Sequence, residues 1–119
     1  MALLIYTKIN EPNLKGYTEE TPMKREQVIE ILSEHNAEMK QQFGVESLSL
    51  FGSVARNEAT EASDVDLLVE FNRPTGLFGL VLLQRYLEAL LGCNVDVGTA
   101  AGLRPRIRER VLREALRVA

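Results

Sequence analysis

The chain has 119 residues, a size typical of one domain and too short for two well-packed ones. Hydrophobic residues make up 45%, charged residues 26%, and the net charge is −3, which excludes a disordered acidic tail and a uniformly basic nucleic-acid binder. The single cysteine, Cys93, excludes an internal disulfide framework and a cysteine-based zinc site, and a free thiol fits a reducing cytoplasm.

The first 22 residues differ in character from the rest of the chain. An apolar run at residues 2–6 has no basic flank before it and is too short for a signal peptide or a membrane span, so we expect a soluble, cytoplasmic protein. Residues 10–21 are polar, and helical patterning begins only after Pro22. We therefore expect residues 1–22 to be an N-terminal extension, whose role the sequence leaves open, and residues 23–119 to form one domain.

Two elements are predicted before the first candidate motif. Apolar residues recur at helical spacing across residues 23–42, which predicts an amphipathic helix that ends near Gly44. His35, the only histidine, lies on the apolar stripe of this helix, and we interpret it as a packing residue in preference to a catalytic base. Residues 45–51 alternate in hydrophobicity, which predicts a strand.

The remaining elements predict an α/β layered arrangement. Residues 65–71 are nearly continuously apolar, which is typical of a central strand. Residues 77–91 form a helical pattern that is apolar on more than one side, which indicates either core packing or an interface with a partner or a second copy of the chain. Gly92 ends this helix, and residues 94–99 predict a third strand. A closing helix follows, with an inward stripe at Ile107, Val111, Ala115 and Val118.

Charge is unevenly distributed along the chain. Residues 104–119 contain six arginines and two glutamates and carry a net charge of +4, so residues 1–103 carry −7. One interpretation of the arginines is a solvated helix surface. The other is that one or two of them face an anionic substrate or partner.

Two aspartates open the predicted central strand. Asp64 and Asp66 are two residues apart, so both side chains point to the same face, while Val65 points into the core. Two nearby carboxylates repel each other unless a cation lies between them, and magnesium is suited because it shares hard oxygen ligands with substrate phosphates. The alternative is that both aspartates cap a turn.

A glycine and a serine end the preceding strand. Gly52 permits close approach of a phosphate to the backbone, and the Ser53 hydroxyl adds a hydrogen-bond donor. The alternative is an ordinary turn in which Ser53 is the N-cap of a helix. At a fixed distance from the aspartate pair, however, the two motifs together indicate a phosphate cradle beside a metal site.

Asp96 is the third candidate carboxylate. It lies between Val95 and Val97 on the third predicted strand, so it points to the face opposite to theirs. There it could bind a metal and help to deprotonate an attacking hydroxyl. The alternative is a surface aspartate on an edge strand.

These motifs resemble those of the minimal nucleotidyltransferases in the DNA polymerase β superfamily. Residues 50–58 and 63–69 carry the glycine–serine and Asp-x-Asp elements at the family spacing. Residues 94–97 resemble the third-acid strand, and residues 107–115 resemble the closing helix. The resemblance covers residues 23–119 and departs at Asn57, where the family usually has glycine; asparagine tolerates the left-handed conformation such a turn needs.

The resemblance implies a polymerase β-like fold with a small mixed sheet backed by helices, ATP as substrate and two magnesium ions. It also implies that Gly52 and Ser53 hold the triphosphate and that Arg56 lies near the phosphates or pairs with Glu58. The metal ligands would be three carboxylates, those of Asp64, Asp66 and Asp96. Many family members act as antitoxins that adenylylate a tyrosine of a HEPN-type toxin, so a toxin of this type is the expected partner.

Four functions follow, and they are not equally supported. The leading one is a nucleotidyltransferase antitoxin that transfers AMP to a partner hydroxyl; the second is an antitoxin that neutralises its toxin by binding alone. Transfer to a small molecule such as an aminoglycoside usually needs an extra domain, for which the chain lacks length. The fourth is RNA-directed transfer that uses the arginine-rich closing helix. This transfer, like direct nucleic-acid binding, is disfavoured because Glu109 and Glu114 interrupt the basic helix and no basic–aromatic patch is present.

Overall fold

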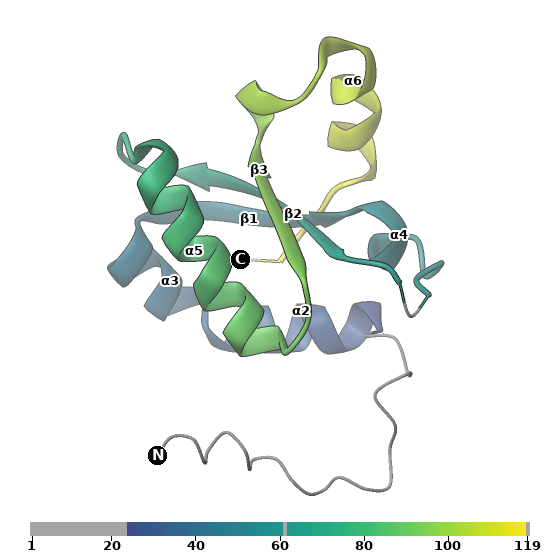
Figure 1. Cartoon of the computed structure of the whole chain (residues 1–119), viewed down its shortest axis with the longest axis horizontal. Coiled ribbons are helices and arrows are strands. Elements are labelled where there is room, and N and C mark those ends of the chain that lie inside the picture. The colour runs from purple at the N-terminus through teal and green to yellow at the C-terminus, as the bar shows by residue number, and fades with distance from the viewer. Residues whose placement is uncertain (1–23, 61, 119) are drawn as a thin grey trace, which may run out of the picture.

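The computed structural model describes residues 24–118 except residue 61, and it forms a four-stranded mixed sheet with helices on both sides (Figure 1). The strands lie in the order β3-β2-β1-β4. β1 is antiparallel to β2 and β4, whereas β2 and β3 run parallel. Their bounds are β1 (Val45–Phe51), β2 (Val65–Phe71), β3 (Val95–Thr99) and β4 (Leu116–Arg117). The predicted α/β fold with a small mixed sheet is confirmed, whereas the predicted extension at residues 1–22 lies outside the described residues.

The helices include two short elements that are absent from the predicted order of helices and strands. These are α4, directly after β1, and the 3₁₀ helix η2, directly after β3. Of the longer helices, α5 matches its prediction and ends at Gly92, whose φ of 71° is left-handed. The bounds are α2 (Arg25–Glu34), α3 (Asn36–Phe43), α4 (Gly52–Ala55), α5 (Gly76–Leu91), η2 (Ala100–Gly102) and α6 (Pro105–Glu114).

The predicted single helix over residues 23–42 is interrupted at His35. The backbone there has φ −107° and ψ 14°, and the His35 N–H donates to the Leu32 carbonyl, a tighter bond than the α-helical one. The His35 ring is half-buried, and its Nδ1 lies 2.8 Å from the Ile31 carbonyl oxygen. A ring tied to the preceding helical turn in this way fits the packing role proposed for it.

One face of the sheet is covered by α2, α3 and α5. Alternate strand residues point to this covered face, and they form a continuous apolar core with the helices. Burying a side chain of this kind stabilises the fold by about 1.5–3 kcal/mol relative to leaving it exposed. The fully buried core residues include Val28, Leu32, Met39, Leu48, Leu50, Leu67, Leu83 and Leu87.

The other face of the sheet is only partly covered, and we call it the open face. Figure 1 shows α6 on the side of the sheet opposite to α2 and α3. Leu68 and Val111 are buried but lie outside the main core cluster, which is consistent with a small separate contact under α6. The arginines at 104, 106, 108, 110 and 113 are all exposed.

The end of the chain corrects the predicted apolar stripe. The closing helix ends at Glu114 and the backbone becomes extended at Ala115, so Val118 does not belong to a helix. Instead β4 pairs with β1, and the Val118 N–H donates to the Leu48 carbonyl at 2.8 Å. Burial of Val118 is therefore achieved through the sheet. Across the described residues, no helix is long and apolar enough to cross a bilayer.

Candidate functional site

Asp66 and Asp96 lie at neighbouring positions on the open face. The parallel register pairs Asp66 of β2 with Asp96 of β3, and it pairs the two preceding valines, Val65 and Val95. Both valines are buried in the core, so the aspartates point the opposite way. Asp66 is half-buried and Asp96 is exposed. The sheet thus places two carboxylates side by side at its open face, as the sequence predicted.

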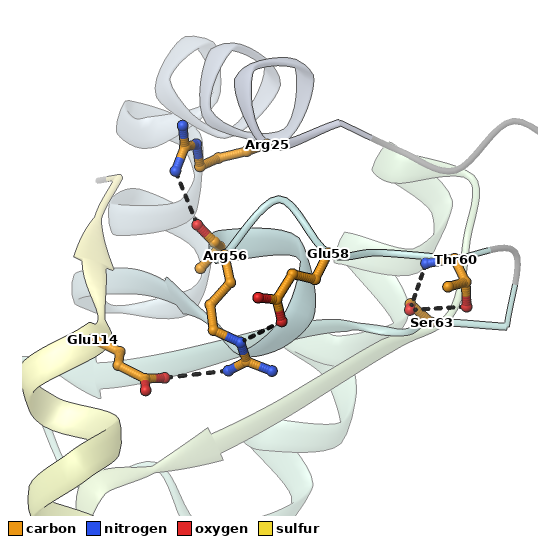
Figure 2. Close-up of polar contacts among 7 residues, drawn as sticks. Arg25, Arg56, Glu58, Thr60, Ser63 and Glu114 are labelled. Atoms are coloured by element: carbon orange, nitrogen blue, oxygen red, sulfur yellow. Dashed lines mark hydrogen bonds and ion pairs between the residues drawn. The ribbon is translucent and has the colours of Figure 1, made fainter.

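Asp64 lies at the end of the loop that leads into β2. It is exposed and precedes the strand, which begins at Val65. The loop is held by a local turn in which the Ser63 hydroxyl accepts from the Thr60 N–H at 2.9 Å (Figure 2). The prediction that both aspartates lie within the strand is therefore correct for Asp66 only, and Asp64 is carried by the strand entrance.

The three carboxylates interact electrostatically. Burial raises the pKa of Asp66, and the negative charges of Asp96 and Asp64 raise it further, whereas Arg56 lowers it. Burial, with Asp64 as the next cause, also raises the pKa of the half-buried Cys93 thiol. The site therefore carries an excess of negative charge that a bound cation would relieve.

Gly52 packs directly against Asp66. Its φ is 78°, a left-handed conformation that glycine adopts without strain, and a Cβ at this position would collide with the Asp66 carboxylate, whose Cγ would lie 3.0 Å away. Ser53 follows in the single turn of α4 and is half-buried. Glycine is thus favoured at position 52 for two reasons. The positive φ strains any other residue, and the neighbouring Asp66 carboxylate leaves no space for a Cβ.

Arg56 links the end of α4 to α6. Its Nε donates to Glu58 at 3.0 Å and its Nη1 donates to Glu114 at 3.2 Å (Figure 2). The pairing with Glu58 is one of the two arrangements that the resemblance implied for Arg56. The bond to Glu114 was not predicted, because Arg56 and Glu114 are far apart in sequence. Hydrogen bonding to Glu58 raises the Arg56 pKa further, so the side chain stays cationic. Asn57 adopts a left-handed φ of 62°, as expected for a residue that replaces glycine in this turn.

Comparison with known families shows the family to which the chain belongs. The nucleotidyltransferase domain family matches residues 32–118, which include Gly52, Ser53 and all three aspartates. The chain belongs to the nucleotidyltransferase family. Its predicted membership of this family and its predicted enzyme class are thereby confirmed.

Two relatives of this nucleotidyltransferase are similar over most of their length. Protein adenylyltransferase MntA of Thermococcus cleftensis is 43% identical over 93 residues, which cover 78% of this chain and 94% of the relative. A solved structure of a provisionally named minimal nucleotidyltransferase is 42% identical, with a TM-score of 0.67, and the match covers 81% of this chain and 97% of that one.

More distant solved structures share the fold. A chain from a toxin–antitoxin crystal structure with AMP-PNP matches with a TM-score of 0.59 at 16% identity, over 82% of this chain and 73% of that one. A chain from a complex of a tri-AMPylated Shewanella oneidensis HEPN toxin with an MNT antitoxin matches with a TM-score of 0.56 at 14% identity, over 76% and 71%.

The donor chemistry of the nucleotidyltransferase site fits magnesium. Carboxylate oxygens are its preferred protein ligands. Burial raises the pKa of Asp66 most, and the charges of Asp96 and Asp64 add to this; a bound cation would offset both effects. In the part of the chain that the structure describes, no three acidic, histidine or cysteine side chains converge closely enough to hold an ion by themselves. Magnesium usually takes one or two protein carboxylates and completes its shell with phosphate oxygens and water, so the site suits an ion that arrives with a nucleotide.

The structure also exposes the first turn of α5. Leu77 and Phe78 are 75% and 77% exposed, so the core-packing interpretation of this helix is wrong for these two residues and right for Leu83 and Leu87, which are fully buried. The positions of apolar residues along the helix could not distinguish the exposed pair from the buried pair, because all four residues are apolar. Exposed apolar side chains of this size are typical of a surface that another molecule covers.

Proposed function

We propose that this nucleotidyltransferase is a magnesium-dependent protein adenylyltransferase that transfers AMP from ATP to a tyrosine hydroxyl of a HEPN-type toxin, and so acts as an antitoxin. The observation that carries the proposal is the pairing of Asp66 with Asp96 on the open face, with Gly52 against Asp66. The name of the Thermococcus cleftensis relative, protein adenylyltransferase, supports the reaction type. The HEPN toxin complex with a similar fold supports the class of partner.

Each residue of the site has a role in this reaction. The backbone at Gly52 and the Ser53 hydroxyl hold the triphosphate, since glycine leaves the strand end open to an anion. Arg56 adds positive charge beside the phosphates while Glu58 and Glu114 fix its position. Two magnesium ions held by the carboxylates of Asp64, Asp66 and Asp96 would neutralise charge on the phosphates as it develops.

The acceptor approaches from the side of Asp96. This carboxylate is exposed on β3, which is the edge strand next to β2, so a hydroxyl from a second protein can reach it. The hydroxyl oxygen attacks the α-phosphorus, the bond from that phosphorus to the bridging oxygen of pyrophosphate breaks, and Asp96 accepts the hydroxyl proton. The products are an AMP–tyrosine ester and pyrophosphate.

Transfer of label from α-phosphate-labelled ATP tests the proposal. Purified protein is incubated with magnesium and a HEPN-type toxin, and label on a tyrosine is identified by peptide mapping. The variant Asp64→Asn/Asp66→Asn should lose transfer, whereas Glu46→Gln, which removes an exposed carboxylate from β1, should keep it. No label on the toxin despite a stable complex would refute the adenylyltransferase proposal for that partner.

Neutralisation by binding alone is the alternative function. The exposed Leu77 and Phe78 favour it, because they offer a docking surface that needs no catalysis. Toxin neutralisation in cells by Asp64→Asn/Asp66→Asn would support binding alone. Loss of neutralisation with Leu77→Ser/Phe78→Ser, in a variant that still folds and still transfers AMP to itself or to a peptide, would support docking through α5. Full neutralisation by that variant would exclude this surface.

A further inference from the structure

A groove lies on the open face of the sheet, beyond the carboxylates. It has a volume of about 480 Å³ and runs over β1 and β2, between the chain after β3 and helix α6. Its lining includes Ser47, Ser49, Leu68, Glu70, Thr99 and Leu112. This volume lies within the range of small-molecule sites in proteins, about 300–1,000 Å³.

The strand register connects the groove to the catalytic end of the face. Phe51 pairs with Asp66, and the next pair on the same face joins Ser49 to Leu68, which both line the groove. Two residues along a strand span about 7 Å. The groove therefore begins at the pair of residues next to Asp66 on the same face of the sheet. A ligand bound in the groove would lie directly beside the Asp66 carboxylate.

The chemistry of the groove differs from that of the phosphate end. None of its described lining residues is a lysine, arginine or histidine, and Glu70 contributes a negative charge, so it is unsuited to phosphate. The Ser47 hydroxyl donates to Glu70 at 3.1 Å, which orients a carboxylate that still has acceptor capacity. Leu68 and Leu112 supply apolar surface beside it. These groups suit a neutral, partly apolar ligand that carries N–H and O–H donors.

We propose that this groove binds the nucleoside part of the nucleotide substrate, with Glu70 accepting hydrogen bonds from its N–H or O–H groups. The inference rests on the proposed function, because it assigns the triphosphate to the Gly52 end and the base and ribose to the groove. It also makes Glu70 a determinant of nucleoside selectivity. The competing occupant is the side chain of the acceptor protein, which is neutral and carries a hydroxyl as well.

Binding of ATP and of inorganic tripolyphosphate, each with magnesium, distinguishes these occupants. Ala101 lines the groove and is exposed in η2, so Ala101→Trp fills the groove with little demand on the core. The matched control is Ala89→Trp, at an exposed position of α5 outside the groove. Calorimetry on the whole chain should show about a tenfold weaker Kd for ATP in Ala101→Trp, equal to about 1.4 kcal/mol, and an unchanged Kd for tripolyphosphate. The control should change neither.

A conservative second variant guards against misfolding. Glu70→Gln keeps shape and exposure but weakens acceptance of hydrogen bonds, and it should raise the Kd for ATP several-fold while circular dichroism stays that of the wild type. An unchanged Kd for ATP in both variants, with a raised KM for the acceptor protein, would overturn the nucleoside assignment and give the groove to the acceptor. If both variants bind ATP more weakly but the wild-type protein transfers no label to the toxin, the groove assignment stands and the proposed transfer is refuted.

Discussion

The two faces of the sheet are built from alternate residues of the same strands, but they differ in what covers them. On the covered face, Leu48, Leu50 and Leu67 are fully buried under helices. On the open face, the same strands present Asp66, Ser49 and other polar side chains that are half-buried or exposed. A shift of register by one residue would exchange the two sets, so packing of the covered face also fixes the position of the carboxylates.

The covered face provides the stability of the fold, and the open face provides the candidate catalytic groups. The covered face stabilises the fold through apolar burial, whereas the open face holds carboxylates at a cost. Partial burial raises the pKa of Asp66, and the charges of Asp96 and Asp64 raise it further. The core thus offsets the cost of the site. Substitutions on the two faces should therefore have opposite signatures, and four of them test this.

The largest effect is expected at Asp66. Asp66→Asn should lower the rate of AMP transfer about a thousandfold, or about 4 kcal/mol, because it removes a ligand for charge neutralisation. Its stability should rise, since the folded state raises the Asp66 pKa and so disfavours the charged form at neutral pH. Thermal unfolding in the presence of a chelator measures the second effect. If Asp66→Asn is both inactive and less stable than the wild type, the claim that the open-face carboxylates reduce stability is wrong.

Leu87→Ala should show the reverse signature. Leu87 is fully buried in α5, so its truncation should cost about 3 kcal/mol of unfolding free energy, measured by urea denaturation. The transfer rate per folded molecule should stay near that of the wild type. Leu82→Ala is the control on the same helix, because Leu82 is 44% exposed and should lose much less stability.

Gly52→Ala tests a position that affects both stability and the site, because Gly52 follows β1 and contacts Asp66. The substitution forces a left-handed φ on alanine, which costs about 1–2 kcal/mol, and it also pushes a methyl group into the Asp66 carboxylate. Gly76→Ala is a close control, because Gly76 has φ 77° but nothing within 4 Å of an added Cβ. Both variants should lose stability, yet only Gly52→Ala should lose transfer activity. Equal activity in the two variants would mean that Gly52 serves the backbone alone.

The smallest effect is expected at Tyr86, a polar contact on the covered side. Its hydroxyl donates to Glu38 at 2.7 Å and so joins α5 to α3. Tyr86→Phe should cost about 1 kcal/mol of stability while keeping the ring contact with Phe43.

The Tyr86 effect should depend on pH. Burial, followed by the bond to Glu38, raises the pKa of Tyr86 to about 12, above the ordinary value of about 10. The folded state therefore holds the proton more tightly, and the stability it gains is complete below pH 10 and lost as the pH rises toward 12. The free energy of unfolding of the wild type and of Tyr86→Phe should be measured by denaturation at pH 8 and at pH 11. The difference between the two proteins should be smaller at pH 11. A constant difference would place the effect in packing alone.

Much of the fold could be predicted because its signals are local. The alternating or continuous apolar runs of β1, β2 and β3 and the long apolar pattern of α5 each lie within one segment of sequence. The faces of Asp66 and Asp96 were also predictable, because each aspartate alternates with apolar neighbours along its strand, and the family resemblance implied that both belong to one site. The assignment of site roles to these residues remains a prediction.

The features that could not be predicted depend on distant contacts. β4 has two residues, too few for a pattern, and it exists because β1 offers a free edge. The bond from Arg56 to Glu114 joins segments 58 residues apart, and the groove combines residues from β1, β2, η2 and α6. At His35 the backbone leaves helical geometry, but the apolar residues keep their helical spacing through this point, so their pattern could not predict the interruption.

The pairing of β4 with β1 has a consequence for association between copies. Residues 116–118 are the last of the described residues, yet they complete one edge of the strand that ends at Phe51, and the Val118 carbonyl also accepts from Ser33 of α2 at 3.3 Å. In a molecule in which this segment has not docked, the N–H and C=O groups along that edge of β1 can pair with a strand of another molecule. Docking of β4 therefore protects β1 from strand exchange between copies.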